Sequence, residues 1–331
     1  MADGLPDFTP VHLLTGFLGS GKTTLLKRLL ADPGLADCAV LINEFGEVGL
    51  DHHLLERIDE TVVMLPSGCL CCTIRGELAG AIRGLLDRRA RGEIAGFRRL
   101  VIESTGLADP FPILSTLHAD PVLRHHVRLG AVVTTIDAVN AAAQLDAQEE
   151  CARQIAVADR LILTKTDLAT PEAIGALRAR IAGLNPEAPL WRADEAAVCA
   201  AALFSESAAA TPVRRDAPTA HDHGGPGHAH HAAIHAFALV FETALDWTMF
   251  GIWLTMLLNR HGGDILRVKG ILHLADSATP VAIHGVQHLV HPPVHMSAWP
   301  DEMRRSRIVF IVRGLEQAAI ERSLRAFLAL A

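Results

Sequence analysis

The amino-acid sequence predicts an α/β protein with a mostly parallel sheet and helices on both faces, followed by a smaller α+β domain. Three observations support this class. Short apolar runs alternate with helical patterns, a glycine-rich turn separates the first run from the first helical pattern, and polar motifs directly follow the apolar runs. The carboxyl ends of parallel strands meet at one edge of a sheet, so the polar motifs are expected to gather there.

The first apolar run, Val11–Thr15, leads into GFLGSGKTT at residues 16–24. Strand, glycine-rich turn, Lys and Thr-Thr opening a helical pattern are typical of a P-loop. Glycines let backbone N–H groups face phosphates, the lysine reaches the β- and γ-phosphates, and the threonine hydroxyl binds Mg²⁺. We therefore predict a P-loop NTPase-type fold. The predicted nucleotide-binding residues in this segment are Gly16, Gly19, Ser20, Gly21, Lys22, Thr23 and Thr24.

Further strands are expected where short apolar runs recur. These runs are Cys38–Ile42, Thr61–Leu65, Leu100–Ile102, Leu129–Ile136 and Arg160–Leu163. The acidic segment NEFGEVGLD (43–51) follows the first of them and has the position of a nucleotide-sensing switch. Within it, Glu44, Glu47 and Asp51 are alternative candidates for orienting an attacking water.

The segment VIESTG places an acidic residue and then a glycine after a strand. Glu103 is expected to meet Mg²⁺ or its water, and the Gly106 amide to meet the γ-phosphate. Together with Lys22 and Thr23, Glu103 forms the predicted catalytic set. No glutamine stands in the usual water-positioning place after the glycine of ESTG, and no arginine finger is identifiable. Slow intrinsic hydrolysis of the nucleotide is therefore expected.

The segment TKTD (164–167) is the predicted base-recognition loop. A carboxylate at Asp167 would accept two N–H groups of guanine, which adenine does not offer, while Lys165 packs along the base. The familiar motif begins with Asn where this chain has Thr164. Because Asp167 can accept both of these guanine N–H groups, GTP is predicted as the nucleotide in preference to ATP.

Three cysteines, Cys69, Cys71 and Cys72, lie between a strand and the start of a helical pattern. Vicinal cysteines bridge poorly, and the helix N-terminus with Arg75 nearby favours thiolates. Thiolates suit Zn²⁺ and tolerate Co²⁺, and three of them leave one position open, as a carrier needs. The remaining cysteines, Cys38, Cys151 and Cys199, are expected to pack as small apolar side chains.

Composition excludes several classes. The chain has 331 residues and a net charge of −7, which argues against nucleic acid as a partner. The most apolar stretch, Phe237–Leu258, is interrupted by Glu242 and Asp246, so no membrane span is predicted. The opening residues MADGLPDF lack a basic and apolar leader, from which we expect a cytoplasmic protein.

The predicted organisation is a GTPase domain at 8–204, a His-rich linker at 205–234 and an α+β domain at 235–331. In the last domain, Trp247 and Trp253 are expected to face the sheet as core residues. The linker is predicted to capture divalent metal weakly through neutral imidazoles. Its auxiliary ligands are His221, His223, His228, His230 and His231.

With GFLGSGKTT, NEFGEVGLD, GCLCCT, ESTGLADP and LTKTDL in this order, the chain resembles the CobW-type P-loop GTPases, a metallochaperone family. RVKGIL (267–272) and residues 295–314 resemble the C-terminal domain of that family. The resemblance implies a GTPase that uses Mg²⁺ at its nucleotide site and delivers a transition metal to a client protein. Zn²⁺ is the first candidate for the delivered metal and Co²⁺ the second. Cobalamin assembly, nitrile hydratase maturation and zinc supply all remain open as client pathways, and a homodimer is plausible by analogy.

Three other hypotheses fit parts of the sequence. A redox-switched GTPase would use the three clustered cysteines to sense oxidant. A small-molecule kinase would need an Arg-rich lid, which we do not find, and a metal-storage module would leave Lys22 and Thr23 without a role. The favoured mechanism has GTP·Mg²⁺ assemble a tight metal site that GDP loosens.

Overall fold

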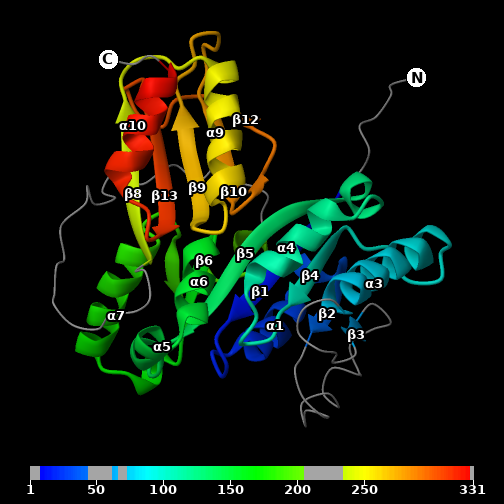
Figure 1. The fold of residues 1–331 in the computed structure, drawn as a ribbon. Helices are drawn as coiled ribbons and strands as arrows, with labels where there is room; N and C mark the ends of the chain where they lie inside the picture. The colour runs from blue at the N-terminus through cyan, green and yellow to red at the C-terminus, as the bar shows by residue number, and fades with distance from the viewer. Residues whose placement is uncertain (1–7, 44–61, 66–72, 205–233, 329–331) are drawn as a thin grey trace. The chain divides into compact units, whose positions relative to one another are not determined.

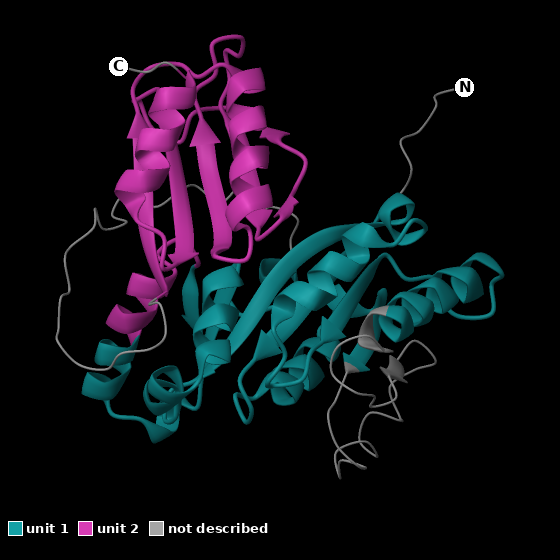
Figure 2. Ribbon diagram, in the orientation of Figure 1, with its two compact units in different colours: residues 1–177, 189–206 teal, residues 178–188, 207–331 magenta. Residues whose placement is uncertain are grey.

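The computed structural model describes residues 8–43, 62–65, 73–204 and 234–328, and these fall into two compact units (Figures 1 and 2). Residues 1–177 and 189–206 form the first unit, and residues 178–188 and 207–331 form the second. The predicted domain boundary at 204/205 lies at the edge of the undescribed segment 205–233, and the one at 234/235 lies one residue beyond that segment, in the strand that begins at Ile234. Both boundaries stay predictions.

The first unit is a seven-stranded sheet in the order β3-β2-β4-β1-β5-β6-β7. Every neighbouring pair is parallel, which confirms the predicted class. Its strands are β1 (Thr9–Gly16), β2 (Cys38–Asn43), β3 (Val62–Leu65), β4 (Arg99–Glu103), β5 (Val127–Asp137), β6 (Arg160–Thr164) and β7 (Leu190–Arg192). All five further strands expected from the sequence are therefore present.

Helices cover both faces of this sheet. The α-helices in chain order are α1 (Lys22–Leu30), α3 (Thr73–Ala90), α4 (Pro110–Ala119), α5 (Ala141–Ala147), α6 (Glu149–Val157), α7 (Pro171–Leu184) and α8 (Ala200–Leu203). On one face, Leu25, Leu26 and Leu29 of α1 pack against alternate strand residues such as Val40 and Val133. On the other face, α3, α4 and α6 lie side by side (Figure 1).

The second unit is an antiparallel sheet in the order β11-β10-β9-β13-β8, with β12 paired to β10. Its elements are β8 (Ile234–Phe241), α9 (Trp247–His261), β9 (Ile265–Leu272), β10 (Val281–Val286), β11 (Leu289–Val290), β12 (Val294–His295), β13 (Ser306–Arg313) and α10 (Gln317–Leu328). Phe250, Trp253, Phe310 and Leu324 contribute to its apolar core. This confirms the predicted α+β class of the second unit.

One core prediction in this unit is wrong. Trp253 is buried, but Trp247 is 40% exposed. The two positions are six residues apart, which turns a helix by about 240°, so they cannot share one face. Trp253 contacts the ring of Phe310, whereas Trp247 occupies the first position of α9 after the capping residue Asp246.

The isolated cysteines also differ from one another. Cys38 and Cys151 are buried as expected, whereas Cys199 is only half-buried. Burial raises the pKa of the Cys38 thiol to about 12, which keeps it protonated and unreactive. Separately, no helix among the described residues is long and apolar enough to cross a membrane.

Candidate functional site

The P-loop lies between β1 and α1 and has the backbone that the glycines were expected to supply. Gly16, Gly19 and Gly21 have φ values of 143°, 73° and 86°, which side chains rarely tolerate. A Cβ on Gly16 would lie 2.3 Å from Thr135 Oγ1 and 2.7 Å from Ser20 Oγ. The turn is therefore tight enough that only glycine fits where the strand enters it.

Lys22 and Ser20 are both folded into this turn. The Lys22 ammonium donates to the carbonyl oxygens of Gly16 at 2.9 Å and Phe17 at 3.3 Å. The Ser20 hydroxyl lies 2.7 Å from the Thr135 hydroxyl of β5, which anchors the loop to the sheet. Thr24, also predicted to bind nucleotide, is exposed in the first turn of α1. The loop thus holds its lysine at the turn that would surround phosphates.

The predicted magnesium residues meet across the sheet edge. The Thr23 hydroxyl donates to Glu103 Oε1 at 2.6 Å, although the residues are 80 positions apart. A hydroxyl and a carboxylate held together beside a P-loop are hard oxygen donors of the kind Mg²⁺ prefers. The donor set therefore fits Mg²⁺, which would be held by Thr23 together with Glu103 or a water on it.

The loop after Glu103 presses against the P-loop. A Cβ on Gly106 would lie 2.6 Å from Leu18 N and 2.7 Å from Leu18 Cα, so the two backbones are in close contact. Gln154 of α6 is buried and donates to the carbonyl oxygens of Gly106 at 3.1 Å and Ala108 at 3.0 Å. These bonds hold the carbonyl side of Gly106, the residue whose N–H group is expected to meet the γ-phosphate.

Arg153 of α6 adds ion pairs that hold the residues just before α4. It pairs with Asp109 at 3.0 Å and with Glu149 at 2.8 Å. Asp109 caps α4 by accepting from the Phe111 N–H at 2.9 Å. The start of α4 is thereby tied to α6 as well as to the loop that follows Glu103.

The TKTD loop is joined to the P-loop by its first residue. The Thr164 hydroxyl lies 2.8 Å from the Ser20 carbonyl oxygen and 3.1 Å from that of Ile136. Lys165 has a left-handed backbone (φ 55°), and its ammonium pairs with Asp137 Oδ2 at 2.7 Å. Asp167 is exposed in the short 3₁₀ turn that follows. The loop therefore presents the exposed carboxylate of Asp167 close in sequence to Lys165, whose position is fixed by its ion pair with Asp137.

Asp137 is a site residue that the sequence did not reveal. Burial favours its neutral form, but hydrogen bonds from Lys165, from the Asn140 side chain and from the backbone N–H groups of Val139 and Asn140 outweigh this and lower its pKa. It is therefore a carboxylate at neutral pH. Its one visible signal was an acid at the end of an apolar strand; Gln154 and Thr135 carried no comparable signal.

The predicted transition-metal ligands lie outside the described residues. Cys69, Cys71 and Cys72 fall in 66–72, and His221, His223, His228, His230 and His231 fall in 205–233. Glu44, Glu47 and Asp51 likewise lie in the undescribed 44–61. Within the described ranges, no group of three or more His, Cys, Asp or Glu side chains is arranged to hold a metal ion.

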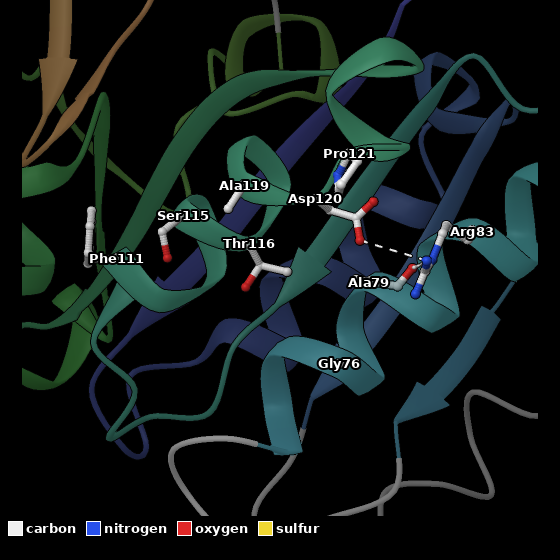
Figure 3. Close-up of a pocket in the computed structure, with 9 residues that line it drawn as sticks. All are labelled: Gly76, Ala79, Arg83, Phe111, Ser115, Thr116, Ala119, Asp120 and Pro121. Carbon is white, nitrogen blue, oxygen red and sulfur yellow. Dashed lines mark hydrogen bonds and ion pairs between the residues drawn. The ribbon is translucent and has the colours of Figure 1, made fainter.

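The helix that follows the cysteine motif is described, and it packs against the helix that follows the Glu103 loop. A groove of about 520 Å³ runs between α3 and α4, with Gly76, Ala79 and Arg83 on one side and Phe111, Ser115 and Asp120 on the other (Figure 3). Arg83 and Asp120 approach to 3.9 Å across it. The two loops are therefore connected through a pair of touching helices.

Comparison with known proteins agrees with this geometry. The family model "CobW/HypB/UreG, nucleotide-binding domain" matches residues 10–192, and "Cobalamin synthesis protein cobW C-terminal domain" matches residues 234–328. The zinc chaperone YjiA of Escherichia coli is 34% identical over 310 residues, covering 91% of this chain and 93% of the relative. The zinc chaperone CobW of Pseudomonas aeruginosa is 33% identical over 362 residues, covering 98% and 94%.

A solved structure supports the same assignment. The crystal structure of Zn(II)-bound YjiA GTPase from E. coli matches with a TM-score of 0.72 and 29% identity, over 97% of this chain and 99% of the other. The parallel sheet, the P-loop and the Thr23–Glu103 pair define a nucleotide-binding protein of the P-loop GTPase fold. The chain belongs to the CobW/HypB/UreG family and also carries its CobW C-terminal domain.

Proposed function

We propose that this chain hydrolyses GTP and carries a transition metal, Zn²⁺ before Co²⁺, at Cys69, Cys71 and Cys72 for delivery to a client protein. The observation that carries the proposal is the hydrogen bond of 2.6 Å between Thr23 of α1 and Glu103, which ends β4 just before the loop that leads into α4. The names of the relatives YjiA and CobW, both zinc chaperones, favour zinc over cobalt as the cargo.

At the nucleotide, each residue has one task. The N–H groups of the P-loop and the Lys22 ammonium bind the phosphates, which replace the carbonyl oxygens that Lys22 now contacts. Thr23 and Glu103 hold Mg²⁺, which neutralises charge on the phosphates when bound. The Gly106 N–H senses the γ-phosphate, and Asp167 with Lys165 recognises guanine. A homodimer across this face and a water-orienting residue in 44–51 complete the scheme.

At the cargo site, thiolate ligands select Zn²⁺ over Mg²⁺ because they are soft donors. Three protein ligands leave one tetrahedral position for a ligand of the client. The histidines of the linker raise the local metal concentration rather than hold the transferred ion. Client recognition falls to the second unit by elimination.

Coupling between the two sites follows from the helix pair. The backbone around Gly106 contacts the P-loop and leads into α4, and α3 starts at Thr73, directly after Cys72. A change in the γ-phosphate therefore moves the Gly106 loop and α4, and with them the start of α3. Switching the metal from mostly bound to mostly free needs about 5 kcal/mol of difference between the GTP and GDP states.

The test is a competition titration of Zn²⁺ and Co²⁺ with the full chain in a non-hydrolysable GTP analogue and in GDP. The C69A/C71A/C72A variant removes the proposed ligands, and Cys199→Ala, which removes a half-buried lone thiol, is the matched control. We expect tight binding with the GTP analogue, weaker binding with GDP, loss in the triple variant and no change in the control.

Equal metal affinity in both nucleotides overturns the gating. Weak binding that is equal in the triple variant and the parent overturns the cysteine site, and peroxide-sensitive hydrolysis without metal dependence would favour the redox reading. Glu103→Gln, which keeps the shape of the side chain, should abolish Mg²⁺-dependent hydrolysis. If GTP turnover persists in that variant, the assignment of Glu103 is wrong.

A further inference from the structure

A second cavity lies at the opposite edge of the parallel sheet from the P-loop. It has a volume of about 510 Å³, which lies in the usual range for small-molecule sites. Its walls include residues at the N-terminal ends of β1, β4 and β5, among them Thr9, Arg99 and Arg128. Because β1 runs from Thr9 to Gly16, the Thr9 end of this cavity is about 20 Å from the P-loop.

The cavity concentrates positive charge in a protein whose net charge is −7. One acidic residue, Asp37, lines it, at 3.4 Å from Arg99. Four guanidinium groups line it as well. They belong to Arg89, Arg98, Arg99 and Arg128. Guanidinium groups match the geometry of phosphate and carboxylate oxygens, and several around one hollow attract multiply charged anions.

A buried histidine adds a hydrogen-bond donor to this wall. His12 of β1 is fully buried, lines the cavity, and accepts from the Ala131 N–H at Nδ1 over 2.9 Å. Burial, with Arg99 and Arg160 nearby, lowers the pKa of His12 to about 3, so the ring is neutral and its proton lies on Nε2. Among the described residues this Nε2 has no hydrogen-bond partner. An unpaired buried donor is costly, and because this nitrogen is shielded from solvent, a ligand oxygen reaches it only when the side chains that cover it shift on binding.

Two aromatic rings of the wall, Phe97 and Phe204, are held in place by their neighbours. The Arg89 guanidinium lies 4.6 Å from the centroid of the Phe97 ring and donates to Thr9 Oγ1 at 3.0 Å and to the Phe97 carbonyl at 2.9 Å. The Phe204 ring lies 5.0 Å from that of His12. Phe8, Pro10 and Ala201 also line the cavity and are more exposed than these two rings. The site therefore combines anion-binding groups with apolar surface, as expected for an organic anion rather than for an inorganic one.

We propose that this cavity is a binding site for a small organic anion. Its phosphate or carboxylate oxygens accept from the arginines and from Nε2–H of His12, and its apolar part lies against Phe8, Pro10 and Ala201. The site is separate from the nucleotide, and the proposal does not depend on metal transport.

The test measures binding of phenyl phosphate, benzoate and inorganic phosphate to the full chain by calorimetry at low ionic strength. A non-hydrolysable GTP analogue with Mg²⁺ is kept saturating, so that the P-loop cannot bind the probes. Two variants weaken the site. R98S/R128S removes two exposed guanidinium groups, and His12→Asn keeps an oxygen for the Ala131 N–H but removes the Nε2 donor.

The matched control is R91S/R124S, which removes two exposed arginines of the same unit that do not line the cavity. We expect one saturable site whose affinity falls at least about tenfold in both site variants and changes less than about twofold in the control. Phenyl phosphate should bind more tightly than inorganic phosphate.

Tighter binding of phenyl phosphate than of benzoate identifies a phosphorylated ligand, and the reverse order a carboxylate. Absence of saturable binding for all three probes overturns the proposal. An equal loss in the control also overturns it, because that loss would reflect general electrostatic attraction. Should the His12 variant misfold, R98S/R128S decides alone, since its side chains are exposed.

Discussion

Asp137 and Lys165 form an ion pair with 2.7 Å between Oδ2 and Nζ, and they come from the ends of adjacent strands 28 residues apart in the sequence. The aspartate side chain is 1% exposed and the lysine side chain 37% exposed, so a buried carboxylate holds the partly exposed ammonium group in place. Lys165 also has a left-handed backbone. The pair therefore fixes the residue that we propose to lie along the guanine base.

Replacing Asp137 by Asn should destabilise the protein by about 2 kcal/mol, because a buried charged hydrogen bond is lost and an amide donor then faces the Lys165 ammonium. Guanine nucleotide affinity should fall as well, since the lysine loses its anchor. Urea unfolding and binding of a fluorescent GDP analogue measure the two effects.

Asp194→Asn is the matched control for this change. The Arg192–Asp194 pair has the same 2.7 Å separation, but its side chains are 43% and 61% exposed. Its loss should change the free energy of unfolding by less than about 0.5 kcal/mol. Equal effects of the two substitutions would show that burial of Asp137 does not strengthen its pair.

Local patterns were sufficient to predict the sheet and the main motifs. Apolar runs such as Cys38–Ile42 and Leu100–Ile102 became strands because runs of that length, between turn signals, are buried on both faces of a parallel sheet. The glycines of the P-loop were interpretable because their left-handed φ values exclude other residues. The pairing of Thr23 with Glu103 followed from the shared strand edge.

What the sequence could not predict depends on distant contacts. Gln154 lies in a helix, and nothing local shows that its side chain reaches the carbonyl of Gly106, 48 residues away. The partner of Lys165 required knowing that β5 and β6 are neighbours. The prediction for Trp247 is wrong because apolar character alone does not place a side chain in the core, and its helical phase differs from that of the buried Trp253.

The Thr164 hydroxyl should contribute to nucleotide binding through the P-loop. Thr164→Val keeps the shape of the side chain but removes the hydrogen bond to the Ser20 carbonyl oxygen. We expect GDP affinity to fall about fivefold, which corresponds to about 1 kcal/mol, because the P-loop loses its tie to the TKTD loop. Thr164→Ser should stay within about twofold of the parent. Titration with a fluorescent GDP analogue decides, and equal affinities of the two variants would contradict the role of the hydroxyl.

Gly106→Ala should impair GTP turnover by displacing the loop after Glu103. The added Cβ would lie 2.6 Å from the backbone N of Leu18, so one of the two loops has to move to relieve the contact. A displacement of about 1 Å in a catalytic loop costs at least about tenfold in rate. Gly80→Ala is the control, since nothing lies within 4 Å of its Cβ in the exposed face of α3. That change should raise the free energy of unfolding by about 0.5–1 kcal/mol and leave turnover unchanged. Steady-state hydrolysis and thermal unfolding provide the readouts, and unchanged turnover in Gly106→Ala would contradict the close contact.

His12 should make the protein less stable in mild acid. Burial together with Arg99, Arg160 and Arg128 lowers its pKa to about 3, while Asp159 opposes the shift. Between about pH 6.5 and 3 the unfolded state binds a proton that the folded state does not, so this contribution to stability is complete above pH 6.5 and decreases as the pH falls. The decrease from pH 7.5 to 5 should be about 2 kcal/mol. Urea unfolding at pH 7.5 and at pH 5 measures this decrease. The free energy of unfolding should fall by about 2 kcal/mol more in the parent than in His12→Asn, which has no imidazole to titrate. Equal decreases in the two proteins would show that His12 is protonated in the folded state.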